Sequence, residues 1–349
     1  MNLFPSHILF NGQYTEIKTL LKQNGTTSWE QDFFEFLREW YNDKDSIKVQ
    51  TSGSTGAPKL IELKKLFVAE SAARTIRFFN LKQSDRILHC LPSRYIAGKL
   101  MLVRALIGKL DLYLVDPSSD FSFLQTQSFK FAAMVVNQVE KLFQLGNEWN
   151  LEYLLIGGSA IPQPLETKLQ HINTLCYSSY AMTETATHIA LRQLNGTNRD
   201  DYYHCLEGIS VDLNQQGCIR IHMSGLESGS IETNDLGELI NTKTFKVPGR
   251  ADNIIISGGI KFLPEQIEEK LEDSIPVPYA ISSAPDERLG EKLILLVESS
   301  ADDALKSAIE MQCRSLLAKY EQPKEIVFTD KLPRTGNGKI DRKKLKSIL

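Results

Sequence analysis

The sequence predicts an α/β protein with a large N-terminal domain, built from mixed and parallel sheets with helices, and a small α+β C-terminal domain. In the first half, short apolar runs alternate with helical stretches, a pattern typical of parallel strands joined by crossovers. After Arg250, a compact order of strand, helix, two strands and helix spans about 100 residues, the size of a separate domain. We therefore expect a large domain over residues 1–250 and a small mobile domain over residues 251–349.

The elements are placed by their apolar patterns. The strand-like runs of the first half are residues 47–50, 87–91, 110–115, 131–136 and 153–156, and those that follow are 219–222, 237–240, 253–256, 279–283 and 292–298. A helix is predicted over residues 28–41, where Ser28 and Gln31 have the spacing of a capping box. A second helix is predicted over residues 64–79, with Leu66, Ala69, Ala73 and Ile76 on one face. Two more are predicted over residues 265–272 and 302–317.

The charge balance excludes several classes of protein. Lys and Arg number 40 and Asp and Glu 43, which gives a formal net charge of −3. This near balance argues against a dedicated duplex-DNA or membrane-surface protein. No apolar run reaches the roughly 18 residues of a transmembrane helix, and the first residues lack the pattern of a secretory signal. We expect no nucleic-acid partner and no stable membrane insertion, and the oligomeric state stays open.

Cysteine and histidine usage indicates a reduced cytoplasmic chain. The five cysteines are scattered and form no CxxC pair, so neither a disulfide framework nor structural zinc is expected. The six histidines form no HExxH motif and no close cluster. Any metal chemistry would therefore use carboxylates.

The glycine-rich segment TSGSTGAPK, residues 51–59, carries the clearest chemical signal. It follows a predicted strand and precedes a predicted helix. Its hydroxyls, flexible glycines and cation can wrap a polyphosphate, and they are Thr51, Ser52, Gly53, Ser54, Thr55, Gly56 and Lys59. It is not a Walker A loop, because Pro58 precedes the lysine and Leu60 follows it. A flexible surface loop is the alternative interpretation.

This segment resembles the phosphate-binding loop of the acyl-adenylate-forming superfamily, which includes acyl- and aryl-CoA synthetases, firefly luciferases and peptide-synthetase adenylation domains. Further motifs occur in family order up to residue 345. The resemblance implies the acyl-adenylate-forming fold, ATP and CoA as co-substrates, Mg²⁺ as cofactor and a small carboxylic acid as substrate. Relatives usually carry a longer segment before this loop, so a shortened N-terminus is also expected.

Two motifs resemble the family's adenine and phosphate contacts. The first is IGGSAIP, residues 156–162, which resembles the loop that lines the adenine through Gly158, Ser159 and Ala160; a simple β-to-α turn is the alternative. The second is SSYAMTET, residues 178–185, which resembles the Tyr-Gly-x-Thr-Glu signature with Ala in place of Gly.

In the second motif, the resemblance gives three residues a role. Tyr180 is expected to stack on the adenine and Thr183 to contact the α-phosphate. Glu184 is expected to hold Mg²⁺, a hard ion that prefers carboxylate oxygen. A polar helix cap is the alternative for this segment.

The ribose contacts are implied by two further segments. NDLG, residues 234–237, resembles the family's Gly-Asp-Leu-Gly, and Asp235 would accept hydrogen bonds from both ribose hydroxyls. The segment 249–268 resembles the family's hinge and the first strands of its small domain. Arg250 would assist at the ribose.

The small domain carries the remaining roles that the resemblance implies. Asp252 falls at the hinge, and Gly258 and Gly259 would form part of the thiol channel. LPRTGNGKIDRKKL, residues 332–345, matches the C-terminal signature of the superfamily, with Lys339 as the mobile catalytic lysine. A solvated basic tail is the alternative for the other lysines of this segment.

These residue types suit adenylate formation, in which two anions must be brought together. A carboxylate oxygen attacks the α-phosphate of ATP, and pyrophosphate leaves. Lys339, Lys59, the loop hydroxyls and Mg²⁺ on Glu184 supply positive charge and donors, so no protein nucleophile is needed. The family's small domain then rotates about the hinge, and CoA attacks the mixed anhydride.

The segment LPSRYIAGKLMLVRAL, residues 91–106, indicates which acid is used. It resembles the acyl-pocket segment of the o-succinylbenzoate–CoA ligases of menaquinone biosynthesis, which has His-x-x-Gly and an Arg nine residues after the His. Tyr95 takes the His place, Gly98 and Arg104 keep their offsets, and Lys99 is a further cation. The second carboxylate of this acid needs a cation in a mostly apolar pocket. An arginine paired with an internal acid, or reaching to solvent, is the alternative for Arg104.

The sequence therefore predicts an AMP-forming acid–thiol ligase, with o-succinylbenzoate as the best candidate acid. Another aryl- or short acyl-CoA synthetase, or a stand-alone carrier-protein-loading adenylation enzyme, would use the same motifs. A non-catalytic binding protein is the third alternative. The joint presence of Lys59, Glu184, Asp235 and Lys339 argues against it.

Overall fold

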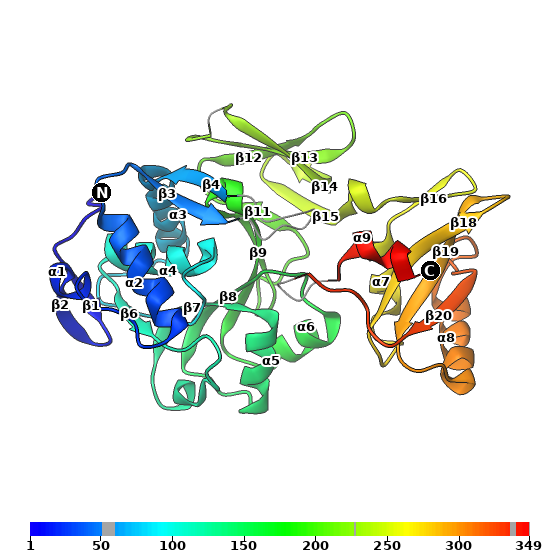
Figure 1. Ribbon diagram of the computed structural model, residues 1–349, viewed down its shortest axis with the longest axis horizontal. Helices are drawn as coiled ribbons and strands as arrows, with labels where there is room; N and C mark the ends of the chain where they lie inside the picture. The colour runs from blue at the N-terminus through cyan, green and yellow to red at the C-terminus, as the bar shows by residue number, and fades with distance from the viewer. Residues whose placement is uncertain (51–59, 227, 336–339, 349) are drawn as a thin grey trace.

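Two large sheets organise the chain in the computed structural model, which describes residues 1–50, 60–226, 228–335 and 340–348 (Figure 1). A thirteen-stranded sheet is formed by strands between residues 7 and 250, and a five-stranded sheet by strands between residues 255 and 329. The smaller sheet lies at the right of Figure 1, in yellow to orange. The chain is thus an α/β protein with mixed sheets, as the sequence predicts.

The centre of the large sheet is parallel, which confirms the prediction from the apolar runs. These strands are β5 (Arg86–His89), β6 (Asp111–Leu114), β7 (Phe129–Val135), β8 (Leu151–Gly157) and β9 (Leu175–Met182). They are hydrogen-bonded in the order β6, β5, β7, β8, β9. Because neighbouring parallel strands end at the same edge, the segments that follow β8 and β9 come together there.

The flanks of the large sheet are mostly antiparallel. One flank continues from β9 through β10 (Thr187–Gln193), β11 (Tyr203–Cys205), β15 (Thr244–Arg250), β14 (Ser230–Asn241), β13 (Cys218–Met223) and β12 (Ile209–Leu213). On the other flank, β1 (His7–Phe10) pairs in parallel with β6, and β2 (Gln13–Glu16) closes the edge. The N-terminal residues thereby extend the sheet.

Helices cover both faces of the parallel strands, as the alternation of their side chains requires. Ile87 and Phe131 pack in a core with α2 (Ser28–Tyr41), α3 (Lys65–Phe78) and α4 (Ile96–Gly108). Leu88 and Ala132, their neighbours in sequence, pack in a second core with α5 (Val136–Gln144) and α6 (Gln163–Leu169). The short α1 (Ile17–Leu20) precedes α2, and 3₁₀ turns occur at Ser122–Gln125, Thr183–Thr185, Ala251–Asn253 and Lys346–Ile348.

The helix α2 has the predicted bounds but a different cap. The structure places the capping box one residue earlier than predicted, at Thr27 and Glu30 instead of Ser28 and Gln31. The Thr27 hydroxyl accepts a hydrogen bond from the Glu30 backbone N–H, and the Glu30 carboxylate accepts from the backbone N–H groups of Thr26 and Thr27. Hydrogen bonds from these threonines lower the pKa of Glu30 to about 2.

Two other local expectations are corrected. The helix expected after the phosphate-loop segment is α3, but the strand β4 (Leu60–Lys64), which was not predicted, comes first and pairs antiparallel with β3 (Ser46–Gln50). In α3, Leu66 is 56% exposed, although the apolar spacing placed it on the buried face. The other residues of that face, Ala69, Ala73 and Ile76, are buried or half-buried, and the buried stripe of α3 also includes the polar residues Ser71 and Thr75.

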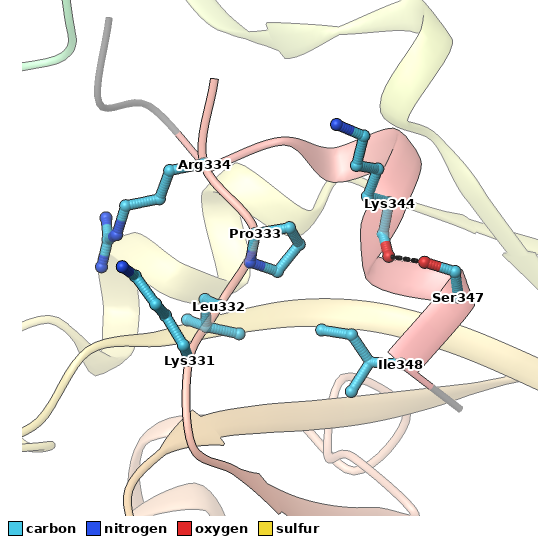
Figure 2. Close-up of a pocket in the computed structure, with 7 residues that line it drawn as sticks. All are labelled: Lys331, Leu332, Pro333, Arg334, Lys344, Ser347 and Ile348. Carbon is cyan, nitrogen blue, oxygen red and sulfur yellow. Dashed lines mark hydrogen bonds between the residues drawn. The ribbon is translucent and has the colours of Figure 1, made fainter. Parts of the chain in front are cut away.

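The smaller sheet has its own apolar core. Its strands are β16 (Ile255–Ser257), β17 (Ile260–Phe262), β18 (Tyr279–Asp286), β19 (Gly290–Glu298) and β20 (Glu325–Thr329), accompanied by α7 (Pro264–Leu271), α8 (Asp303–Leu316) and α9 (Arg342–Leu345). Their buried apolar side chains form clusters that contain no residue before Ile255. An open hollow of about 440 Å³ between the segment before Thr335 and α9 is lined by Lys331, Leu332, Pro333, Arg334, Lys344, Ser347 and Ile348 (Figure 2). It contains none of the residues predicted to bind substrates.

Across the described residues, no helix has both the length and the apolar character needed to cross a membrane.

The cap of α2 can be tested by substitution. We expect Thr27→Ala to lower the free energy of unfolding by about 1 kcal/mol, because a helix N-terminal N–H loses its acceptor. Ser28→Ala is the matched control and should cost less than about 0.5 kcal/mol. Urea denaturation of both variants measures the difference. A larger loss for Ser28→Ala would contradict the assignment of the cap to Thr27.

Candidate active site

The loop after β8 and the end of β9 form one edge of the candidate site. Ile156 of β8 pairs with Ser178 of β9, so the two motifs lie on adjacent strands. A Cβ added at Gly157 would lie 2.7 Å from the Ser179 Oγ, so a side chain here would displace that hydroxyl, which donates to the Ile156 carbonyl oxygen. Gly158 has a φ of +89°, which favours glycine. Ser159 and Ala160, which follow it, are exposed.

A hydrogen-bonded network joins three of the predicted motifs. The Tyr180 hydroxyl at the end of β9 donates to the Asp235 Oδ2 at 2.7 Å, and the Arg250 Nη1 donates to the Asp235 Oδ1 at 2.9 Å. The Arg250 Nε and Nη2 also donate to the two carboxylate oxygens of Asp252, at 2.9 and 3.0 Å. Residues far apart in the sequence therefore meet at the end of the parallel strands.

The network is charged and open to solvent on one side. The side chains of Asp235, Arg250 and Asp252 are 21%, 32% and 31% exposed, so a ligand can reach them. Burial, together with the Asp235 charge, raises the pKa of Tyr180. Burial acts to lower the pKa of Arg250, but the hydrogen bond to Asp252 and the Asp235 charge raise it overall. Each Asp235 oxygen has a second lone pair, so the carboxylate can accept further hydrogen bonds from a ligand.

The segment after β9 is a 3₁₀ turn, Thr183–Thr185, not the start of a longer helix. The turn ends at Ala186, which is buried and has a φ of +60°. The Glu184 side chain is half-buried, and no described residue forms a hydrogen bond or an ion pair with it. Its carboxylate is therefore available to a ligand.

The donor set around Glu184 fits Mg²⁺ but not a metal held by protein alone. Among the described residues, no group of three or more His, Cys, Asp and Glu could hold a metal ion. Mg²⁺ is usually bound through one or two carboxylates together with substrate phosphates and waters. A single carboxylate beside a threonine is consistent with that mode.

The start of α4 is held by backbone packing and by an ion pair. Tyr95 is the N-cap and is 39% exposed. A Cβ added at Gly98 would lie 2.3 Å from the carbonyl oxygen of Pro92, so only glycine fits this contact. The Lys99 Nζ lies 2.8 Å from the Glu39 Oε2 of α2. Lys99 therefore already has an acid partner within the chain, which weakens the prediction that it binds the substrate.

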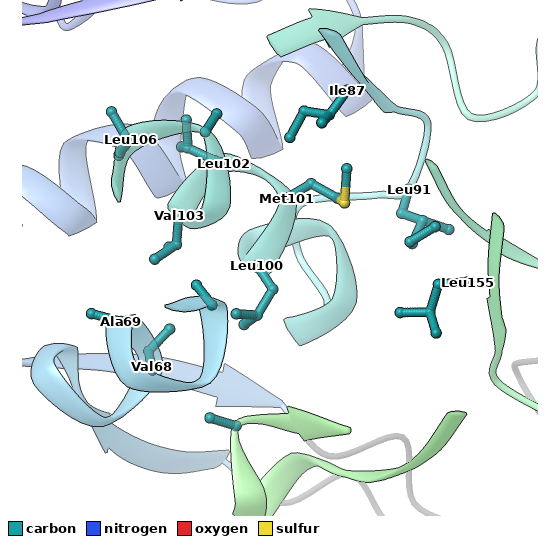
Figure 3. Close-up of a cluster of buried hydrophobic side chains, with 14 of the residues drawn as sticks. Val68, Ala69, Ile87, Leu91, Leu100, Met101, Leu102, Val103, Leu106 and Leu155 are labelled. Carbon is teal, nitrogen blue, oxygen red and sulfur yellow. The ribbon is translucent and has the colours of Figure 1, made fainter. Parts of the chain in front are cut away.

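Arg104, on the same helix, is buried without an acid partner. Only 1% of it is exposed. Its helix contributes Leu100, Met101, Leu102, Val103 and Leu106 to a buried apolar cluster with Val68 and Ala69 of α3 and Ile87 of β5 (Figure 3). Its Nη1 faces the Met101 Sδ at 3.3 Å, its guanidinium carbon lies 5.7 Å from the centre of the Phe131 ring, and its Nε has no hydrogen-bond partner. No Asp or Glu of the described chain forms an ion pair with it. Burial lowers the pKa of Arg104 to about 9, so it is still charged at neutral pH.

Two histidines that the sequence analysis passed over lie beside this cation. His89 of β5 and His188 of β10 are 1% and 2% exposed. Burial and the Arg104 charge lower both pKa values, that of His89 to about 3, so both rings are neutral. The sequence held one signal, because His89 interrupts an otherwise apolar strand run.

The predicted hinge and thiol-channel residues lie where the chain enters the smaller sheet. Gly258 and Gly259 have φ values of +58° and +80° and form the two-residue turn between β16 and β17. Asn-Gly or Gly-Gly turns of this kind require positive φ at both positions, which explains both glycines without a ligand. Asp252 lies in the 3₁₀ turn Ala251–Asn253.

Some predicted residues cannot be placed in this geometry. The phosphate-loop residues Thr51 to Gly56 and Lys59, and the predicted catalytic Lys339, lie outside the described residues. The segment after Lys339 is anchored by Arg342, whose Nη2 lies 2.5 Å from the Glu268 Oε2 of α7. The Arg342 Nε also lies 3.5 Å from the Glu265 Oε1. The sequence analysis did not single out this pairing.

The match to known proteins defines the class of this chain, an AMP-binding enzyme. Residues 43–215 match the AMP-binding enzyme family, and residues 266–339 match the AMP-binding enzyme C-terminal domain. The chain is 31% identical to an acyl-CoA synthetase (AMP-forming)/AMP-acid ligase II-like protein from Dyadobacter fermentans, covering 94% of this chain and 96% of that one with a TM-score of 0.61. The chain belongs to the AMP-binding enzyme family.

Two further relatives are more specific. The chain is 25% identical over 338 residues to a 2-succinylbenzoate–CoA ligase from Listeria monocytogenes, covering 89% of this chain and 72% of that protein. It also has the fold of an o-succinylbenzoate coenzyme A synthetase from Bacillus subtilis, solved in complex with ATP and magnesium ion. That structure is 23% identical with a TM-score of 0.73, covering 85% of this chain and 69% of that one.

The contact at Gly98 can be tested by adding one methyl group. We expect Gly98→Ala to lower the free energy of unfolding by about 1–3 kcal/mol, because the methyl overlaps the Pro92 carbonyl and α4 must shift. Chemical denaturation measures the loss. An unchanged midpoint would show that α4 does not pack as closely as described.

Proposed function

We propose that this chain is an ATP-dependent acid–CoA ligase that activates 2-succinylbenzoate. A carboxylate oxygen of the acid attacks the α-phosphorus of ATP, the bond to pyrophosphate breaks, and an acyl-adenylate forms. The thiol of CoA then attacks the acyl carbon and AMP leaves. Membership of the AMP-binding enzyme family supports the reaction, and the names of the curated relatives support the acid.

The described residues suit the nucleotide part of this reaction. Tyr180 lies at the end of β9, next to the strand that leads into the exposed loop of Gly158, Ser159 and Ala160, and its ring would stack on the adenine. Asp235 offers its remaining lone pairs to the ribose hydroxyls, and Arg250 holds that carboxylate in place. Thr183 lies next to Glu184 in the 3₁₀ turn that follows this strand and would contact the α-phosphate. Positioning and electrostatics of this kind are sufficient for transfer at phosphorus.

Glu184 would hold Mg²⁺, together with oxygen atoms of the nucleotide. When bound, the ion supplies positive charge against the phosphates. The phosphate loop with Lys59 and the catalytic Lys339 complete the proposal as the other sources of positive charge. We also keep the division into a large domain, residues 1–250, and a small mobile domain, residues 251–349, which turns about Asp252 to admit CoA past Gly258 and Gly259.

The buried Arg104 is the observation that carries the choice of acid. A buried charge without a partner is costly, and proteins normally pair it. An acid with a second carboxylate would supply the missing partner from outside. 2-Succinylbenzoate has this second carboxylate, separated from the activated one by an aromatic ring, a ketone and two methylene groups. The five unpaired cysteines support a cytoplasmic location for the reaction.

A pyrophosphate-release screen over aromatic and aliphatic acids tests the function. We expect release with 2-succinylbenzoate and ATP, and formation of the acyl-CoA and AMP only when CoA is added. Chelation of divalent ions with EDTA should stop both steps, because the nucleotide phosphates lose their cation. Release with a simple aryl or short acyl acid, and none with 2-succinylbenzoate, would favour another aryl- or short acyl-CoA synthetase.

Lys339→Ala tests the assignment of the catalytic lysine. We expect adenylate formation to fall by roughly 10²–10³-fold, the usual loss when one group that stabilises transition-state charge is removed. The circular dichroism spectrum should not change. Lys343→Ala, in the same basic tail, is the matched control and should keep most of the activity. Equal losses in both variants would contradict a special role for Lys339.

Arg104→Met tests the carboxylate partner through two opposite effects. We expect the KM for 2-succinylbenzoate to rise roughly 10- to 100-fold, because a charge-assisted hydrogen bond is lost. The KM for benzoate should change little. The free energy of unfolding should increase by about 1–4 kcal/mol, because an unpaired buried charge is replaced by an apolar side chain. Equal KM changes for both acids would contradict the role of Arg104.

A further inference from the structure

We infer that His89 is a specificity-determining residue, which donates a hydrogen bond from its Nδ1 to the same substrate carboxylate that Arg104 binds. This inference deepens the proposed function and rests on it. It concerns a position that neither the sequence motifs nor the comparisons assign.

His89 and Arg104 lie on the same side of the large sheet, the side that α4 covers. Ile87 and His89 point to the same face of β5 because side chains alternate along a strand. Ile87 pairs with Phe131 of β7, and the Arg104 guanidinium lies over the Phe131 ring. The His89 ring also lies 5.6 Å from the Phe33 ring of α2, on this same side of the sheet.

Each of the two side chains has one buried nitrogen without a partner. These are the His89 Nδ1 and the Arg104 Nε, and they are two of only four such side-chain atoms among the residues described. The Arg104 Nε–H can only donate. Two unpartnered polar atoms in one apolar region are costly, unless a ligand that reaches both of them completes the site.

The Ser93 hydroxyl can place the proton of His89 on Nδ1, as the inference requires. Its Nε2 lies 3.0 Å from the Ser93 Oγ, also buried, and Ser93 has no other hydrogen bond among the described residues. If the Ser93 hydroxyl donates to Nε2, the neutral ring carries its proton on Nδ1. The unpartnered atoms are then both N–H donors, and one carboxylate, with two oxygens, can accept from both.

This arrangement rejects acids that lack the second carboxylate. A site built to hydrogen-bond a substrate group leaves its own buried donors unpaired when that group is missing, and discrimination is then large. His188 is the contrasting neighbour. It is also buried beside Arg104, but its Nε2 is 3.2 Å from the Thr75 Oγ1 and it contributes no unpartnered atom.

Matched amide substitutions separate the two ring nitrogens. The amide nitrogen of His89→Asn replaces Nδ1, whereas that of His89→Gln replaces Nε2. We expect His89→Asn to bind 2-succinylbenzoate nearly as the wild-type protein does, and His89→Gln to bind it roughly 10- to 100-fold more weakly. Calorimetry in the presence of AMP measures binding without the reaction, and benzoate, which should bind His89→Gln no more weakly than wild type, is the reference ligand.

His188→Gln is the control for changing a buried histidine beside Arg104. It should alter the affinities for both acids equally. If His89→Gln also weakens both acids equally, or if His89→Asn is as weak as His89→Gln, the inference is overturned.

Two measurements keep the test decisive where the His89 variants do not fold. Ser93→Ala keeps the imidazole and removes the group that fixes its proton, so the affinity for 2-succinylbenzoate should fall while that for benzoate stays. Nitrogen-15 NMR of the wild-type protein should show a protonated His89 Nδ1 that shifts when 2-succinylbenzoate is added. An unprotonated Nδ1, or one that does not shift, overturns the inference.

The outcomes for the inference and for the proposed function differ. A wild-type protein that binds 2-succinylbenzoate through His89 but releases no pyrophosphate would refute the ligase function alone. Pyrophosphate release that His89→Gln reduces equally with every acid would refute the role of His89 alone. A wild-type protein that does not bind 2-succinylbenzoate overturns the inference and the choice of acid, and leaves ligase activity with other acids to the screen.

Discussion

The carboxylate of Asp235 is the point on which the candidate site depends. It accepts hydrogen bonds from Tyr180 on β9 and from Arg250 on β15, and Arg250 in turn holds Asp252. Charge-assisted hydrogen bonds are stronger than neutral ones, and Arg250 is bidentate to Asp252, so its orientation is fixed as well. The end of the parallel strands, the antiparallel flank and the entry to the smaller sheet are thereby tied to one side chain.

The buried charge of Arg104 is a second constraint, and it lowers the stability of the protein instead of raising it. Arg104 lies on α4, whose apolar residues form a buried core with α3 and the sheet, and it forms no ion pair with any described residue. A protein selected for stability alone would place an apolar side chain at this position. The cost is understandable if the charge is kept for a ligand, since sites that bind and discriminate often lower the stability of the protein that carries them.

The fold was largely predictable because it depends on regular signals. The parallel strands β5 to β8 appear as apolar runs, and α2 has its predicted bounds. Both could be predicted because burial of one or two faces of an element produces a regular pattern of apolar residues in the sequence. The predicted cap of α2 and the predicted burial of Leu66 in α3 were both wrong, and for the same reason. At both places polar side chains decide the local structure, through Glu30 and Thr27 in the cap and through Ser71 and Thr75 in the stripe.

The residues of the site could be predicted only where they lie in a local sequence motif. Asp235, Tyr180 and Arg250 lie in three recognisable segments, and the structure adds that they touch. His89 could not be found in this way, because its importance comes from its position beside Arg104, 15 residues later in the chain and on a different element. The same is true of Lys99, whose partner Glu39 comes from another helix. A contact between residues far apart in the sequence cannot be predicted from the residues near either one.

The anchoring of Arg342 has a mechanical consequence. Its guanidinium is clamped to Glu268, and near Glu265, on α7, and Glu265 in turn accepts a hydrogen bond from Asn253. The segment from Ile340 onward is thus fastened to α7, and α7 is joined through Asn253 to the turn that holds Asp252. If the small domain turns about Asp252, as proposed, this segment would move together with α7 and would not need to refold.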